Sequence, residues 1–438
     1  MRPKKFDIQG LFGRKDTISI DLESNVKIIY GINGSGKTTI LKLLEAILTG
    51  RLFEIRNVNF KSLVLHLDNG KSIKATRAKK SSKKTERRRS IFTLKLEFIS
   101  PSGKIEETSQ MDDEAELTEK VPLDIIEHEI PELNRIGRRE WADATTGDYL
   151  TLSDVISRYS DRLPWLQPST EIGWYRKLVR GFSVKFIQTQ RLITMKSEAG
   201  PYNPRRAVRY QNTVIEYSER LRELIRDKLS DSMSMAQSLD SSYPRRLLQE
   251  TGTRLSDKRL KELLAKTEQL GAKLRQVELL SSGDNVDIIF ESISEDNRRA
   301  IALYLSDSVK KYEALEPFAD KLLLFLDIVN TKFKPTKSVQ IGGREGIRIG
   351  LSGGGEIHPR LLSSGEQHEI VLLFDLIFFS EPGTLVLIDE PEISLHIDWQ
   401  KKFLSDVEAI GKAADLRFLL ATHSPAIIGT RFDICKEI

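Results

Sequence analysis

The chain has 438 residues, more than one compact core usually contains, so we expect two or three structural units. Apolar residues make up 39% and charged residues 30%, which favours a globular protein over a disordered one. No apolar run reaches the roughly 18 residues of a membrane span, and the N-terminus lacks the apolar core of a signal peptide. The single cysteine excludes an internal disulfide, so we expect a cytoplasmic protein without a membrane partner. The net charge of +5 permits an acidic partner without requiring one.

The first part of the chain predicts an α/β unit. Strand-like runs at 4–10 and 17–30 precede a glycine-rich turn and an apolar helix from about 38 to 48. Residues 60–100 predict a β-hairpin, because leucines alternate with other residues on both of its arms. A strongly basic run at 79–89 lies between the arms.

The rest of the chain alternates between sheet and helix. Residues 182–187 predict a strand, and a long zone at 213–333 predicts helices with an apolar stripe at 3–4 spacing. The residues of this stripe include Leu260, Leu263, Leu264, Leu270, Leu274 and Val277. The fully apolar runs 385–388 and 418–421 are typical of buried parallel strands.

Residues 31–38 match the P-loop pattern G-x-x-x-x-G-K-[ST] between a predicted strand and a predicted helix. Glycines let backbone N–H groups converge on phosphate oxygens, and the helix that follows adds its positive end. Lys37 can reach the β- and γ-phosphates of ATP, and the Thr38 hydroxyl can coordinate Mg²⁺. The expected phosphate-binding residues are Asn33, Gly34, Ser35, Gly36, Lys37, Thr38 and Thr39.

Two acidic residues, Asp389 and Glu390, follow the apolar run 385–388 in a Walker B arrangement. A carboxylate at the end of a buried strand can bind Mg²⁺, directly or through water, and its neighbour can polarise the attacking water. We therefore expect Asp389 to bind the metal and Glu390 to be catalytic.

Two further motifs stand in the same order along the chain. The string 362–367, Leu-Ser-Ser-Gly-Glu-Gln, is similar to an ABC signature motif, with Ser364 and Gly365 at the start of a helix where an anionic γ-phosphate can bind. The same string also suits a plain helix cap. His423 follows the apolar run 418–421 and can contact the γ-phosphate and the attacking water.

Taken together, these motifs resemble those of ABC-type ATPases of the SMC, RecF and OLD-like group. The segments 389–396 and 421–425 and the opening Gly10-Leu11-Phe12-Gly13 are most similar to OLD-like ATPases. The resemblance implies a homodimer or higher homo-oligomer, in which Ser364 of one copy faces ATP bound by Lys37 of another. It also implies that 394–396 forms the loop linking the two sites, although His396 departs from the usual S-A-L-D pattern.

The resemblance also implies a Q-loop, which would contribute a glutamine to the metal. Residues 186–192 resemble it, with Gln190 preferred and Gln188 as the alternative; an ordinary strand end remains open. Residues 238–246 are similar to a further OLD-like segment to which no role is attached.

These patterns predict an α/β ABC ATPase head with a mixed sheet, interrupted by a β-hairpin-containing insert and a helical insert. The expected segments are 1–60, the N-terminal lobe with the P-loop; 61–180, the β-hairpin and mixed insert; 181–212, the return to the head with the Q-loop; 213–335, a helical arm or bundle; and 336–438, the C-terminal lobe with the signature, Walker B and His loop.

The stretch after His423 is too short for a TOPRIM nuclease domain, which OLD-family nucleases carry, so we expect no nuclease in this chain. The pattern resembles stand-alone ATPase subunits of prokaryotic anti-phage systems of the PARIS and Septu types. That resemblance implies an effector in trans, such as a TOPRIM-type nuclease. The run 79–89 is either a site for nucleic acid or an acidic trigger protein, or a solvated hairpin tip. The alternative function is a RecF- or SMC-like DNA-binding ATPase, and a transporter ATPase fits least.

Overall fold

The computed structural model describes residues 1–56, 58–79, 92–111, 123–130, 132–137, 139–143, 149–152, 155, 159, 172–187, 193–200, 203–249, 256–281, 295–343 and 346–438. They form two compact units. The first unit comprises Met1–Arg191, Met195–Tyr210 and Ser380–Ile438, and the second comprises Leu192–Thr194 and Gln211–Phe379. Within the described residues, none of the helices combines the length and the apolar composition needed to cross a membrane.

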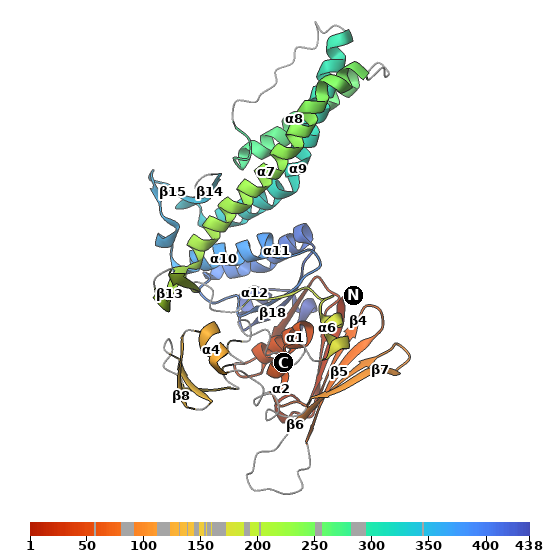
Figure 1. The fold of residues 1–438 in the computed structure, drawn as a ribbon, viewed down its shortest axis with the longest axis vertical. Coiled ribbons are helices and arrows are strands. Elements are labelled where there is room, and N and C mark those ends of the chain that lie inside the picture. Colours follow the sequence, from red (N-terminus) through yellow and green to blue (C-terminus); the bar gives the residue numbers. More distant parts are fainter. Residues whose placement is uncertain are drawn as a thin grey trace. The chain divides into compact units, whose positions relative to one another are not determined.

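An antiparallel sheet forms one layer of the first unit (Figure 1). Its strands, in spatial order, are β2 (Thr17–Asp21), β1 (Pro3–Gln9), β4 (Ser62–Leu67), β5 (Ser72–Lys79), β6 (Phe92–Ile99) and β7 (Ile105–Met111). The leucines of β4 alternate as predicted, with Leu63, Leu65 and Leu67 buried. The predicted hairpin of 60–100 is thus part of a larger sheet, in which β5 pairs with β6 up to Lys79↔Phe92. Residues 80–91, most of the basic run, lie outside the described residues.

A parallel sheet forms the second layer of this unit. Its strands, in spatial order, are β11 (Val184–Ile187), β17 (Leu385–Asp389), β18 (Arg417–Thr422), β3 (Val26–Tyr30) and β19 (Cys435–Glu437). Every residue of β17 and β18 is buried, which confirms the prediction of buried parallel strands. Because β3, β17 and β18 are parallel, their carboxyl ends meet at one edge of the sheet, where ligands bind in folds of this class.

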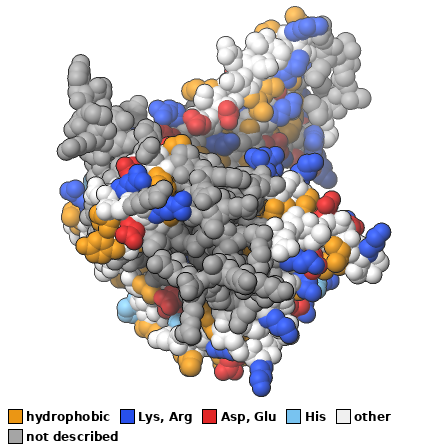
Figure 2. All heavy atoms as spheres, turned by 60° about the horizontal axis from the view of Figure 1, so that its bottom comes forward, with side chains coloured by type: hydrophobic (Ala, Val, Ile, Leu, Met, Phe, Trp, Pro, Cys, Tyr) orange, Lys and Arg blue, Asp and Glu red, His pale blue; other side chains and the backbone are white. Residues whose placement is uncertain are grey.

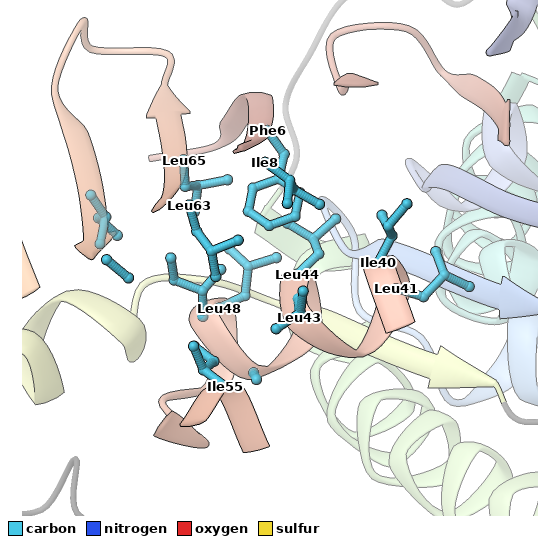
Figure 3. Packing of buried hydrophobic residues seen from close by; sticks show 14 of the residues in the cluster. Phe6, Ile8, Ile40, Leu41, Leu43, Leu44, Leu48, Ile55, Leu63 and Leu65 are labelled. Carbon is cyan, nitrogen blue, oxygen red and sulfur yellow. The ribbon is translucent and has the colours of Figure 1, made fainter. Parts of the chain in front are cut away.

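Helix α1 (Lys37–Thr49) is at the centre of the hydrophobic core of the first unit. Its apolar residues are buried around most of the helix, together with Phe6 and Ile8 of β1 and Leu63 and Leu65 of β4 (Figure 3). Leu385 and Leu387 of β17 belong to the same cluster, so α1 is packed from both sheets. The short helix α2 (Leu52–Arg56) extends this core through Ile55.

Smaller elements complete the first unit. Helix α4 (Leu123–Glu129) and strands β8 (Leu133–Gly137), β9 (Glu140–Asp143) and β10 (Tyr149–Thr151) enclose a separate small core around Trp141. The other elements are the 3₁₀ helices Leu11–Gly13 and Phe432–Ile434 and the helices α6 (Gly173–Val179), α11 (Ile397–Ala414) and α12 (Pro425–Ile428). Strands β12 (Ile193–Gly200) and β13 (Asn203–Asn212) pair with each other.

The second unit contains the predicted helical zone. We call helices α7 (Thr213–Gln249), α8 (Asp257–Gln276) and α9 (Glu295–Phe333) the arm helices. Helix α9 packs against both α7 and α8 (Figure 1). Leu260, Leu270 and Leu274 of the predicted stripe are buried, as is Val277. Together with the two sheets of the first unit, these helices confirm the predicted α/β class, with helical and β-containing segments between the strands.

Residues 336–379 also belong to the second unit, whereas the predicted division places them with the C-terminal lobe. They form β14 (Lys337–Gly342), β15 (Gly346–Leu351), β16 (Glu356–Ile357), the 3₁₀ helix Pro359–Leu361 and helix α10 (Ser364–Phe378). A fully buried ion pair between Lys332 of α9 and Glu369 of α10 joins this segment to the arm helices. Within the segment itself, the Lys337 ammonium of β14 lies 2.6 Å from the Glu366 carboxylate of α10.

Residues 238–246, for which the sequence indicated no role, lie inside α7 and attach it to α9. The Arg246 guanidinium donates to both carboxylate oxygens of Asp307, at 2.8 and 2.5 Å. It also donates to the Leu239 carbonyl at 2.8 Å, close to the point where Pro244 interrupts the helical hydrogen bonds. The Tyr243 hydroxyl donates to the Ala300 carbonyl at 3.1 Å.

We predict that Asp307→Asn destabilises the C-terminal half of α7, because Arg246 then loses a buried anionic partner. The expected local loss is about 1–3 kcal/mol, which hydrogen exchange over 238–248 measures. Asp240→Asn is the matched control, since Asp240 is exposed and pairs with Lys311 at the surface. It is expected to change exchange by less than about 0.5 kcal/mol. Equal effects of the two substitutions would contradict the assignment.

Candidate functional site

A cleft of about 420 Å³ lies at the edge where the carboxyl ends of β3, β17 and β18 meet. All of its lining residues belong to the first unit. They are Phe12, Asn33, Gly34, Gly36, Lys37, Thr38, Thr39, Glu390 and His423. The parallel sheet thereby brings together three motifs that are far apart in the sequence.

The predicted P-loop connects β3 to α1 and forms one wall of the cleft. Gly34 and Gly36 have φ values of 78° and 103°, a region that favours glycine. A helix leaves its first N–H groups without partners inside the helix, and those of α1 begin at the cleft. The Ser35 hydroxyl oxygen is buried and makes no hydrogen bond within the described residues. An anion with several oxygens, such as a triphosphate, fits this set of donors.

The Lys37 side chain is buried and points at acceptors. Its ammonium donates to the carbonyls of Gly31 and Ile32 at 3.0 and 3.1 Å, and lies 3.2 Å from Nδ1 of His423. Burial lowers the pKa of Lys37, and the nearby Glu390 carboxylate opposes this shift in part. An anionic ligand in the cleft would favour the charged form of this lysine.

Thr38, the residue after the P-loop lysine, contacts Asp389 at the end of β17. The Thr38 hydroxyl donates to the two Asp389 oxygens at 3.1 and 2.9 Å. Burial raises the pKa of Asp389, the Thr38 hydrogen bond opposes this, and Glu390 adds to it. A hydroxyl and a carboxylate are ligands that Mg²⁺ accepts, with phosphate and water oxygens completing its shell. Among the described residues, no three His, Cys, Asp or Glu side chains cluster as a complete metal site.

Glu390 and His423 face each other across the cleft. His423 Nε2 lies 3.7 Å from the Glu390 carboxylate, and Nδ1 of the same ring faces Lys37. Glu390 has a φ of 47°, which is strained for a residue with a Cβ, and its N–H donates to the Ala421 carbonyl at 2.8 Å. The strand end thus fixes the backbone that directs this carboxylate into the cleft.

The predicted signature serine belongs to the second unit. Ser363 is the N-cap of α10 and forms a capping box with Glu366, whose carboxylate accepts from the Ser363 N–H at 2.8 Å. The capping role is therefore taken by Ser363, and Ser364 is exposed in the first turn beside Gly365. This leaves the Ser364 hydroxyl available for a ligand at the helix start.

The two glutamine candidates for the Q-loop, Gln188 and Gln190, lie outside the described residues, so their role stays a prediction.

Two residues at the site were not found from the sequence. Phe12 lines the cleft with a φ of 53°, and a Cβ on Gly36 would lie 2.7 Å from its ring. Glu392 accepts hydrogen bonds from the residues around His423. The sequence of 10–13, Gly-Leu-Phe-Gly, did not indicate that Phe12 has a positive φ or that it lines the cleft. Glu392 stood two residues after Glu390, but its partners come from another strand.

Comparison with known proteins identifies a family. A family model described as "AAA ATPase domain" matches residues 1–428. No curated protein matches the chain.

Solved structures similar to the chain include the SMC head domain from Thermotoga maritima, at 10% identity and a TM-score of 0.33, covering 98% of this chain and 91% of that one. The Smc head domain with an extended coiled coil bound to the C-terminal domain of ScpA, from Pyrococcus furiosus, has 12% identity, a TM-score of 0.35 and the same coverage. These similarities are too low to transfer a partner or a residue's role.

We predict that Asp389→Asn stabilises the nucleotide-free protein at neutral pH while it removes Mg²⁺-dependent activity. A raised folded-state pKa means that the protonated carboxyl favours folding, and this contribution is lost as the pH rises through that pKa. An amide is neutral throughout, so the free energy of unfolding at pH 7 is expected to rise.

Denaturant unfolding at several pH values measures this effect. The gain should shrink as the pH falls and vanish below about pH 3, well under the ordinary aspartate pKa, where the carboxyl is protonated in both states. Asp398→Asn, at an exposed carboxylate on α11, is the control and should give no gain. A lower stability of Asp389→Asn at pH 7 would show that ionised Asp389 supports the fold.

Proposed function

The chain belongs to the AAA ATPase domain family, and from this premise we propose that it is an ATP-driven switch that controls a partner effector. The chain binds ATP and Mg²⁺ and pairs with a second copy around the nucleotide. Hydrolysis of ATP then returns it to the unpaired state. The observation that carries the ATPase part is that Lys37, Thr38, Glu390 and His423 line one cleft, with Asp389 hydrogen-bonded to Thr38.

The roles follow from the contacts. Lys37 and the first N–H groups of α1 bind the β- and γ-phosphates, while Thr38 and Asp389 coordinate Mg²⁺, which neutralises phosphate charge. Glu390 accepts the proton of the attacking water, because its carboxylate lines the cleft. His423 lies between Lys37 and Glu390 and orients the γ-phosphate and the water.

Pairing through the nucleotide is supported by two kinds of exposed groups. In the first unit, Ile32 of the P-loop is 81% exposed, and Ile393 and Ile397 beyond Glu390 are also exposed. Apolar groups around a polar cleft favour coverage by another protein surface. In the second unit, Ser364 is exposed at the start of α10, where it can bind a γ-phosphate presented by a second copy.

The effector is proposed to be a nuclease or another toxin that acts in anti-phage defence. The support is the similarity of 389–396 and 421–425 to OLD-like ATPases. A TOPRIM-type nuclease supplied in trans is the effector class that this similarity favours.

A DNA-binding role of the RecF or SMC type is the second candidate. Its support is the basic run 79–89, which begins at the end of β5. Over the coloured part of the face in Figure 2, Lys and Arg side chains are dispersed among acidic and apolar ones and form no continuous basic surface.

We predict that Glu390→Gln binds ATP with an affinity close to that of the unchanged protein but hydrolyses it at least about 100-fold more slowly, because the proton acceptor is lost. The variant should also remain paired in ATP, as light scattering detects. Glu390→Gln combined with Ser364→Arg is the matched control, in which the arginine blocks the helix start and pairing should be lost. Normal turnover of Glu390→Gln would overturn the catalytic assignment, and pairing of the double variant would overturn the shared site.

We predict that Glu390→Gln, tagged at its native locus and isolated in ATP, retains a stoichiometric protein effector. The unchanged protein should release that effector when it hydrolyses ATP or meets a phage trigger. The double variant that cannot pair is the control bait. Recovery of DNA without a protein partner, lost steeply as salt rises, would instead establish the DNA-binding alternative.

A further inference from the structure

Glu392 lies two residues after Glu390, but it does not line the cleft. Its carboxylate is directed at the chain that follows β18. One oxygen, Oε1, accepts from the backbone N–H of His423 at 2.7 Å. The other, Oε2, accepts from the Thr422 hydroxyl at 2.8 Å. A single carboxylate thus holds both the peptide of His423 and the side chain that precedes it.

A second set of hydrogen bonds closes around this contact. The Thr422 oxygen accepts from the Ser424 N–H at 2.9 Å, and the Ser424 hydroxyl donates to Oε1 of Gln400 at 2.6 Å. The Gln400 amide donates to the Leu395 carbonyl at 3.0 Å. The loop after β17 and the segment after β18 are therefore joined on both sides of Glu392.

The same loop contains two strained residues. Glu390 has a φ of 47° and Ser394 a φ of 64°, and neither is a glycine. Such conformations persist only where surrounding contacts determine them. Glu392 lies between the two and makes the contacts that cross from one strand end to the next.

We propose that Glu392 is a positioning residue, which fixes the backbone of His423 so that its ring lies between Lys37 and Glu390. The inference deepens the proposed ATPase function and rests on it. Glu392 itself touches neither nucleotide nor water. Its effect on turnover passes through His423, because the peptide that it binds carries that ring.

The contact itself is tested without ATP. In Glu392→Gln the side chain keeps its size but loses its charge, so the hydrogen bond from the His423 N–H is no longer charge-assisted and is weaker. We expect the amide of His423 to exchange hydrogen roughly 10-fold faster in the full-length, nucleotide-free protein. Glu408→Gln, at an exposed carboxylate of α11 that pairs with Arg431, removes the same charge and should leave this exchange unchanged.

The functional consequence is tested by steady-state kinetics and a double-mutant cycle. Glu392→Gln should lower kcat by about 10–100-fold with KM for ATP changed less than about 3-fold, since the P-loop contacts remain. His423→Gln should lower kcat by a similar factor, and the double substitution should be no slower than the slower single one. Thr422→Val should also lower kcat, because the hydroxyl that binds Glu392 is lost. Thr422→Ser keeps the hydroxyl and should turn over ATP at the rate of the unchanged protein.

Each outcome decides a separate point. Multiplicative losses in the cycle would show that Glu392 does not act through His423 and would overturn the proposal, as would unchanged exchange in Glu392→Gln. Faster exchange with normal turnover would also overturn it, because the contact would then be structural alone. Lack of ATP turnover in the unchanged protein would refute the proposed function instead. The exchange measurement would still test the contact between Glu392 and His423, because it needs no ATP.

Discussion

The burial of helix α1 is the constraint on which the site depends. Both sheets of the first unit contribute to the cluster around it, so its axis and its N-terminus are determined together. Because α1 follows β3 directly through the P-loop, its first N–H groups lie at the same edge as the ends of β17 and β18. A loss of packing around α1 would therefore displace the N–H groups at the start of α1 without changing any residue of the P-loop.

The site contains charges that the fold alone does not favour. Burial lowers the pKa of Lys37 and raises that of Asp389, so both side chains are less stable in their charged forms than in water. On the proposed function, a triphosphate would complement the charge of Lys37, and Mg²⁺ would complement that of Asp389, which is hydrogen-bonded to Thr38. Binding of the two ligands together would thus relieve the cost of burying a positive and a negative charge at neighbouring positions. Functional sites commonly lower stability in this manner.

Much of the site is predictable from the sequence because its parts are local. The P-loop, the apolar runs of β17 and β18 and the acidic pair after β17 are each encoded within about ten residues. The cap of α10 was also available, since Ser363 and Glu366 have the spacing of a capping box. The contact of Glu392 with His423 could not be predicted, because it joins the segments that follow two different strands, β17 and β18. The roles expected of Gln190 and Gln188 stay predictions.

The grouping of 336–379 with the arm helices also depends on contacts distant in sequence, and it bears on how the switch would work. Lys332 and Glu369 form a fully buried pair, and Lys337 binds Glu366, the residue that forms a capping box with Ser363 around Ser364. Separating a buried pair leaves uncompensated charges and costs about 3–5 kcal/mol. Helix α10 therefore moves together with the base of α9 more easily than against it. On the proposed function, nucleotide contact at Ser364 would displace the arm, and a partner bound to the arm would in turn alter the affinity of Ser364 for nucleotide.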